Sequence, residues 1–251
     1  MRTCKHLHDS GKMPAPTLLL LPVRSHNPAM RSRSTGPHSL GIGGYKASKT
    51  DRGYRPTAHI NRRVTQSIFR AFDYAKAIGT PLNLYVVLNL RENVGKGAAT
   101  IFADIRHRYR DWLSYISRKQ SDVLARPAYI YTLENPGDVH PHANWAVHIP
   151  VEFQDNFMKK LPLWLARAQG HCGTNDCDVQ PINQDYAKKL AKYIVKATDP
   201  AFIDHFHLMA EACDQGTIYG KRAGVSPSLG HAVRRIAQFR PSRRYYGPRA
   251  A

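Results

Sequence analysis

Two apolar runs on either side of a Pro136-Gly137-Asp138 turn constrain this fold more than any other segment of the chain. In the second run, polar and apolar residues alternate. Because alternate residues of a strand point to opposite faces, the run would have one polar and one packed face. The polar positions are His140, His142, Asn144 and His148, and the apolar positions are Ala143, Trp145, Val147 and Ile149. The pattern predicts an antiparallel hairpin with strands over 128–134 and 139–149.

The rest of the middle region alternates between helical and extended patterns. Apolar residues at three- and four-residue spacing predict helices within 61–79, 100–118, 151–168 and 186–197. Branched and aromatic runs predict strands over 82–90 and 177–182. This order predicts an α+β fold, in which helices cover an antiparallel sheet with split βαβ (ferredoxin-like) connections.

Positive charge is concentrated at the two ends of the 251-residue chain, whose formal net charge is +19. Residues 1–60 contain ten Lys/Arg against two Asp/Glu, and residues 217–251 contain eight against none. We therefore expect a disordered basic tail over 1–56, a folded domain over 57–215 and a basic arm over 216–251. Basic ends of this kind predict a polyanionic partner, although basic tails can also serve solubility alone.

Cysteine usage and hydropathy indicate a cellular compartment. Four cysteines are too few and too scattered for a disulfide scaffold, and His171, Cys172 and Cys177 lack an evident fourth zinc ligand. The leucine run at 18–21 is too short to cross a bilayer. We expect a reduced, cytoplasmic protein without a membrane partner.

The predicted helix over 186–197 carries two tyrosines seven residues apart, so both lie on one side. Each is followed three residues later by a lysine, giving the pairs Tyr186/Lys189 and Tyr193/Lys196. A lysine one turn from a phenol can stabilise phenolate and hold a phosphate. The same pattern is also typical of an ordinary amphipathic helix with a basic outer side.

The polar face of the histidine strand suggests a metal site. His142, Asn144 and either His148 or His140 can supply ligands, and Glu134 ends the neighbouring strand with a carboxylate. Such a set suits Mg²⁺ or Mn²⁺ when the substrate is a phosphate. The alternative is a solvated polar face on an antiparallel sheet.

Three segments in this order resemble the motifs of the HUH endonucleases, and in particular replication initiators of bacterial plasmids and filamentous phages. They are the strand at 82–90, the HANWAVHIP sequence at 142–150 and the YIVK sequence at 193–196. The resemblance implies an HUH-type sheet over roughly 60–235. It also implies rolling-circle initiation, with DNA nicking and joining through a 5′-phosphotyrosine, a metal ion, and host helicase and polymerase as partners.

The resemblance assigns Tyr193 as the nucleophile with Lys196 beside it, and Tyr186 as the fallback. The strict His–apolar–His triplet is absent, because Asn144 replaces its second histidine. His140-Pro141-His142 has both histidines, but a proline fits poorly in a paired strand. His205 and His207 match the triplet after the tyrosine helix, in the wrong order along the chain.

The basic residues of the tyrosine helix and the C-terminal region are candidate nucleic-acid contacts, interleaved with aromatic residues that can stack on bases. They are Lys189, Lys192, Lys221, Arg222, Arg234, Arg235, Arg243 and Arg244. Two other functions fit the same pattern. One is a non-catalytic domain that binds single-stranded nucleic acid, and the other is a relaxase or transposase of the same chemistry.

Overall fold

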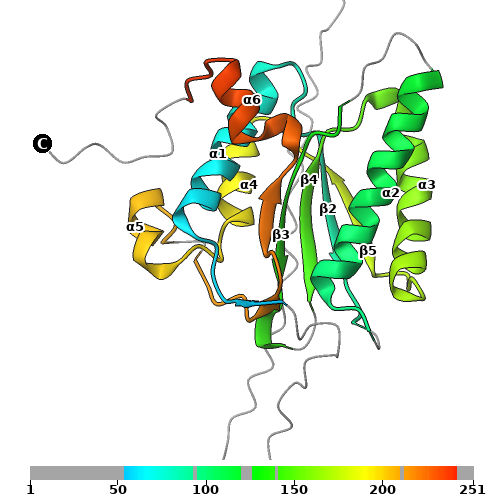
Figure 1. Ribbon diagram of the computed structural model, residues 1–251, viewed down its shortest axis with the longest axis horizontal. Helices are drawn as coiled ribbons and strands as arrows, with labels where there is room; N and C mark the ends of the chain where they lie inside the picture. The colour runs from blue at the N-terminus through cyan, green and yellow to red at the C-terminus, as the bar shows by residue number, and fades with distance from the viewer. Residues whose placement is uncertain (1–53, 93–94, 120–125, 139–140, 210–211, 242–251) are drawn as a thin grey trace, which may run out of the picture. The chain divides into compact units, whose positions relative to one another are not determined.

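The computed structural model describes residues 54–92, 95–119, 126–138, 141–209 and 212–241 (Figure 1). Five strands form an antiparallel sheet in the order β5-β2-β4-β3-β7. They are β2 (Leu84–Asn89), β3 (Tyr129–Glu134), β4 (His142–Val147), β5 (Cys177–Pro181) and β7 (Ala223–Val225). The short strands β1 (Pro56–Thr57) and β6 (Ile218–Tyr219) pair separately.

The described helices are α1 (Arg62–Ala77), α2 (Ala98–Lys119), α3 (Val151–Gln169), α4 (Ala187–Ile194), α5 (Ile203–Phe206) and α6 (His231–Ile236). Helices α2 and α3 lie on one side of the sheet, and α1 and α4 lie on the other (Figure 1). The prediction of an α+β fold with an antiparallel sheet covered by helices is confirmed. Among the described residues, no helix combines the length and the apolar character that crossing a membrane requires.

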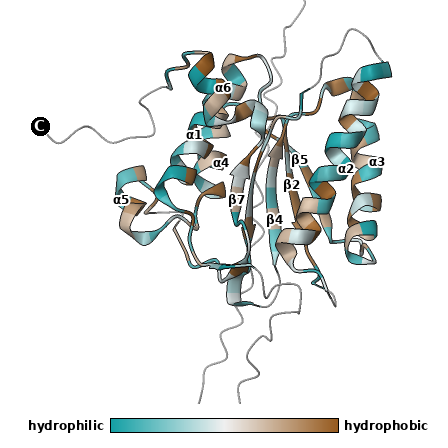
Figure 2. Ribbon diagram, in the orientation of Figure 1, coloured by the Kyte–Doolittle hydropathy of each residue, from teal (hydrophilic) through white to brown (hydrophobic). Residues whose placement is uncertain are grey.

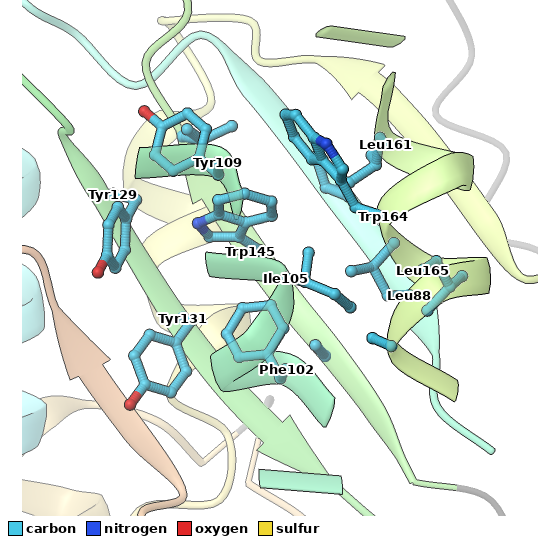
Figure 3. Close-up of a cluster of buried hydrophobic side chains, with 14 of the residues drawn as sticks. Leu88, Phe102, Ile105, Tyr109, Tyr129, Tyr131, Trp145, Leu161, Trp164 and Leu165 are labelled. Atoms are coloured by element: carbon cyan, nitrogen blue, oxygen red, sulfur yellow. The ribbon is translucent and has the colours of Figure 1, made fainter. Parts of the chain in front are cut away.

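The sheet face toward α2 and α3 is packed with aromatic rings. Trp145 is fully buried at its centre, and its ring centroid lies 5.1 Å from that of Tyr109 and 5.7 Å from that of Phe102 (Figure 3). Helices α2 and α3 carry both hydrophilic and hydrophobic residues along their lengths (Figure 2), as expected for helices with one buried side. Large aromatic side chains bury much apolar area, so this layer is the main hydrophobic core.

The opposite face is apolar over only part of its area. Ile130 and Ala146 pack there against α1, and Ala191 and Ile194 of α4 join the same cluster. Toward the other end of β3 and β4, the same face presents polar side chains. Glu134 is paired with His142, and Thr132 with Asn144. Because paired residues of neighbouring strands share a face, this register places all four side chains on the α1/α4 side.

The expected boundary of the basic arm differs from the structure. Strand β7 pairs with β3, β6 pairs with β1, and α6 follows in the same compact unit of described residues. The short β7 segment carries little periodic signal of its own. Its strand identity depends on pairing with β3, which sequence composition does not reveal. The expected tail over 1–56 and arm beyond 241 lie mostly outside the described residues.

Two local features of helices α3 and α4 complete the fold. Helix α3 runs from Val151 to Gln169 without a break and contains Pro162. Tyr186 occupies the N-cap of α4 without a side-chain hydrogen bond to the helix, and in the preceding turn the Asn183 side chain accepts from the Asp185 amide.

Candidate active site

The polar end of the α1/α4 face centres on the Glu134 carboxylate, which is fully buried. Its Oε2 atom lies 2.8 Å from His142 Nε2 and 2.9 Å from Lys196 Nζ. Burial disfavours ionisation of this carboxyl. The hydrogen bond from His142 and the charge of Lys196 outweigh that penalty and hold the pKa of Glu134 below its ordinary value. Glu134 is therefore an ionised carboxylate held by two partners.

Lys196 brings the tyrosine into the same cluster. It follows α4, whose apolar residues Ala191 and Ile194 dock the helix on the sheet, and its side chain reaches Glu134. Its Nζ lies 4.0 Å from the centroid of the Tyr193 ring. Burial disfavours the charged ammonium, but Glu134 and then Tyr193 outweigh it and raise the pKa of Lys196. The ammonium thus bridges an anionic carboxylate and a phenol ring.

Tyr193 is accessible, whereas its partners are not. Tyr193 is 39% exposed, and Lys196 is 8% exposed. The site therefore exposes a phenol to solvent beside a buried ion pair.

Asn144 belongs to the same surface through Tyr85 of β2. The Tyr85 hydroxyl donates to Asn144 Oδ1. Burial, and next to it Tyr193, raises the pKa of Tyr85 well above its ordinary range, so it remains a neutral donor. Tyr85 was not anticipated from sequence, because an aromatic residue in a strand rich in valine and leucine is typical of a core position.

Three buried polar atoms of this surface have no hydrogen-bond partner among the described residues. They are Glu134 Oε1, Asn144 Nδ2 and Thr132 Oγ1. Buried polar groups are normally satisfied, so such a group of unpaired atoms is typical of a functional site. A bound ligand or water molecules could supply the missing partners at this place between β3 and β4.

The donor set for a metal is partial. No group of three or more His, Cys, Asp or Glu side chains in the described ranges is arranged to hold an ion. Glu134 and His142 supply one carboxylate and one imidazole that bond each other, and Asn144 on the same face adds an amide oxygen that also accepts from Tyr85. Oxygen-rich ligands with one imidazole suit Mn²⁺ or Mg²⁺. Glu134 Oε1 is the orphaned atom that such an ion would satisfy.

The other histidines predicted as ligands are placed differently. His148 follows the far end of β4, where its Nδ1 lies 2.7 Å from the Pro81 carbonyl oxygen. Six residues along a strand separate it from His142 by roughly 20 Å. His140 lies outside the described residues. His205 ends up in α5 and His207 at its C-cap, so this triplet is not on a strand.

Some of the tyrosines and lysines predicted from the sequence lie in the Glu134 cluster, and others lie on the surface away from it. Tyr186 is 49% exposed, and Lys189 Nζ lies 5.2 Å from its ring centroid, away from the Glu134 cluster. Lys192 donates to the His207 carbonyl oxygen at 2.8 Å. Of the two predicted tyrosines, it is therefore Tyr193 whose neighbouring lysine also pairs with Glu134.

Among the other predicted nucleic-acid contacts, Lys221 and Arg235 are exposed. Arg222 is 2% exposed, and its Nη2 donates to the carbonyl oxygens of Gln215 and Gly216. Arg234 is buried and donates to Ser67. Arg222 is thus part of the folded interior, and Arg243 and Arg244 lie outside the described residues.

Comparison with known proteins does not assign the chain to a family. The sequence matches no protein-family model, and no curated protein is significantly similar to it. The case for a function therefore depends on the geometry of the site.

Proposed function

We propose that the protein is a metal-dependent DNA-nicking and joining enzyme that uses Tyr193 as its nucleophile and initiates rolling-circle replication. The observation that carries the proposal is the Lys196 ammonium, which contacts both the Tyr193 ring and the Glu134 carboxylate that His142 also binds. A phenol, a cation and a candidate metal-binding pair thus converge at one end of the sheet.

The sheet supports an HUH-type, ferredoxin-like arrangement. Strands β2 and β3 flank β4, and each is antiparallel to it, so β2 and β3 are parallel and separated by one strand. Strand β5 pairs with β2 in the same way. These pairings are what two split βαβ units, β2-α2-β3 and β4-α3-β5, require.

In the proposed reaction, the Tyr193 oxygen attacks a phosphorus atom of single-stranded or extruded DNA. The new O–P bond replaces the bond to the 3′ oxygen, which takes up a proton as the phenol loses one. Lys196 is placed to balance the negative charge that develops on the phenol oxygen and the phosphate. The attack of the free 3′-hydroxyl on the phosphotyrosine reverses the step and joins the strand.

Glu134, His142 and Asn144 are the residues that would hold Mg²⁺ or Mn²⁺. When bound, such an ion supplies Lewis-acid polarisation of the phosphate oxygen. Titration with Mn²⁺, followed by the loss of the free-ion electron paramagnetic resonance signal, tests this assignment without DNA. We expect binding by the wild type and at least a tenfold weaker affinity for Glu134→Gln, with His148→Ala as the control that retains wild-type affinity. Equal binding by both variants would remove Glu134 from the site.

The test of function is a covalent adduct. Single-stranded oligonucleotides that tile the DNA flanking the gene are incubated with protein and Mn²⁺, and complexes that survive denaturing detergent are counted. We expect an adduct with wild type, none with Tyr193→Phe, and an undiminished adduct with Tyr186→Phe, the matched variant on the same helix. Loss with Tyr186→Phe alone would reassign the nucleophile.

A second function is favoured by one observation: Glu134 is already neutralised by Lys196 and His142, as in an ordinary structural ion pair. A domain that binds single-stranded nucleic acid without cleaving it would show affinity for the oligonucleotides and no adduct in the wild type. We propose a cytoplasmic location and host helicase and polymerase as partners on the basis of the replication function alone.

A further inference from the structure

A basic groove that is separate from the Glu134 cluster lies at the β7 edge of the sheet. A groove of about 610 Å³ is bounded by α1, β7 and α6. Its basic lining consists of Arg63, Arg70, Lys221, His231 and Arg234, and none of its lining residues is acidic. Ligand sites commonly have volumes of this size. A groove with cations on three elements and no counter-ion in its walls is suited to a phosphate-rich ligand.

Two arginines that line the groove, Arg70 and Arg234, repel each other electrostatically. Arg234 is 5% exposed, and its guanidinium is held by Ser67 Oγ at 3.0 Å. Burial, and next to it the positive charge of Arg70, lowers the pKa of Arg234. The Arg70 Nε atom is buried and has no hydrogen-bond partner among the described residues. An anion in the groove would relieve this repulsion and satisfy the unpaired donor.

Backbone amides add uncharged donors on the opposite wall. Strand β7 is at the end of the described sheet. The Leu133 amide donates to the Arg222 carbonyl oxygen and the Ser226 amide to that of Tyr129, so the even-numbered residues of this segment bond to β3. By the alternation of an antiparallel ladder, the N–H groups of Ala223 and Val225 point outward, and both residues line the groove. Outward amides of this kind are common phosphate contacts.

The groove also lies near the candidate active site. Ala223 is the partner of Thr132, and Glu134 is two residues farther along β3, on the same face of the sheet. A linear ligand in the groove therefore lies only two strand positions from the level of Glu134. Cations spread over three elements match a chain of phosphates better than one compact anion.

We propose that the groove between α1, β7 and α6 binds the sugar–phosphate backbone of single-stranded DNA beside the tyrosine site. The choice of DNA rests on the proposed function, whereas the recognition of a phosphate chain rests on the groove alone. Arg63 and Lys221 supply exposed charges, Arg70 supplies the unpaired guanidinium donor, and β7 supplies the amides.

The experiment measures binding of a fluorescent single-stranded 30-mer by anisotropy over a salt series, in full-length protein carrying Tyr193→Phe so that no covalent step interferes. The test variant is Arg63→Ala/Arg70→Ala. The control is Arg62→Ala/Lys76→Ala, which removes the same charge from exposed positions of the same helix, α1. Arg62 stacks on Phe202 at 5.6 Å, and neither control residue lines the groove.

We expect the test variant to bind at least tenfold more weakly, with a salt slope reduced by about 1.4, since each lost phosphate contact on a single strand reduces it by about 0.7. The control should stay within about threefold of the parent. A second test variant, Arg63→Glu/Lys221→Glu, changes only exposed side chains and therefore tests the groove if the first variant folds poorly.

Equal losses in the test and control variants would overturn the proposal, since charge alone would then explain binding. Binding of inorganic polyphosphate as tight as that of DNA, and as dependent on Arg63 and Arg70, would overturn the assignment to nucleic acid. The two proposals fail separately. Groove-dependent binding without an adduct in protein that retains Tyr193 rejects the nuclease, and an adduct with groove-independent binding rejects the groove.

Discussion

The two faces of the central sheet use the same strands for different purposes. The α2/α3 face is apolar throughout, with Trp145 fully buried among aromatic rings. The α1/α4 face is apolar near Ile130 and Ala146 and then changes, within four residues of the same strands, to Glu134 and His142. Because one face supplies most of the apolar burial, the other can hold ionised and unpaired polar groups that reduce stability.

The largest effect should come from the aromatic face. Trp145→Ala removes the central ring, and we expect the free energy of unfolding to fall by about 3–5 kcal/mol, as for other large-to-small core substitutions. Urea denaturation measures the change. Val87→Ala, on the opposite face and half-buried, is the control and should cost less. Equal losses would show that the two faces contribute alike.

The next effect concerns the buried ion pair. Lys196→Met leaves the Glu134 carboxylate with His142 alone, and we expect a loss of about 3 kcal/mol, because an uncompensated buried charge is costly. Adding Glu134→Gln to Lys196→Met should recover part of this lost free energy. A double-mutant cycle measures the recovery. Lys192→Met on α4 is the control and should cost little, since its ammonium donates to an exposed carbonyl oxygen. A double variant whose loss equals the sum of the single losses would exclude coupling between Glu134 and Lys196.

Much of this arrangement was predictable from local sequence. The alternation from His142 to Ile149 correctly placed Trp145 on the packed face and Asn144 on the polar face. Helical spacing and branched runs located α1, α2, β2 and β5 to within a few residues. These features are local because each depends on the repeat of one strand or one helix.

The contacts between elements were not predictable in the same way. Alternation assigns His148 to the same face as His142, but it says nothing of distance along the strand, and only His142 meets Glu134. Arg222 was predicted to contact nucleic acid because it lies in a basic segment. It directly precedes β7, however, and is buried in the folded interior. Tyr85 reaches Asn144 only because β2 pairs with β4, and this pairing of distant segments does not follow from local composition.

A smaller effect should follow from the Tyr85–Asn144 contact on the polar end of the α1/α4 face. Tyr85→Phe keeps the ring and leaves Asn144 Oδ1 without its partner, so we expect a loss of about 1 kcal/mol. Thermal and urea unfolding measure it. Tyr193→Phe, whose side chain is 39% exposed, is the matched control and should change stability very little. A larger loss with Tyr193→Phe would mean that the nucleophile candidate is a structural tyrosine.

The smallest effect is expected for the half-exposed ion pair between Arg91 and Asp176, in contrast to the buried pair between Lys196 and Glu134. Arg91 Nη2 lies 2.9 Å from Asp176 Oδ1, but the Arg91 side chain is 60% exposed, against 9% for Lys196. The hydrogen bond from Arg91 lowers the pKa of Asp176. Because the folded-state pKa lies below the unfolded value of about 3.9, the stabilisation is fully present above about pH 4 and is lost as the pH falls through the folded-state pKa.

The difference in Tm between the wild type and Asp176→Asn should therefore be constant from pH 7 to about pH 5 and should shrink on further acidification. Added salt should reduce it at pH 7, because solvent screens the exposed Arg91. The salt-dependent part of the Lys196→Met effect should be much smaller, because that pair is shielded from solvent. If the Asp176→Asn difference persisted unchanged at pH 2, hydrogen bonding in the turn before β5, where the Gly173 amide also donates to Asp176, would account for it instead of charge.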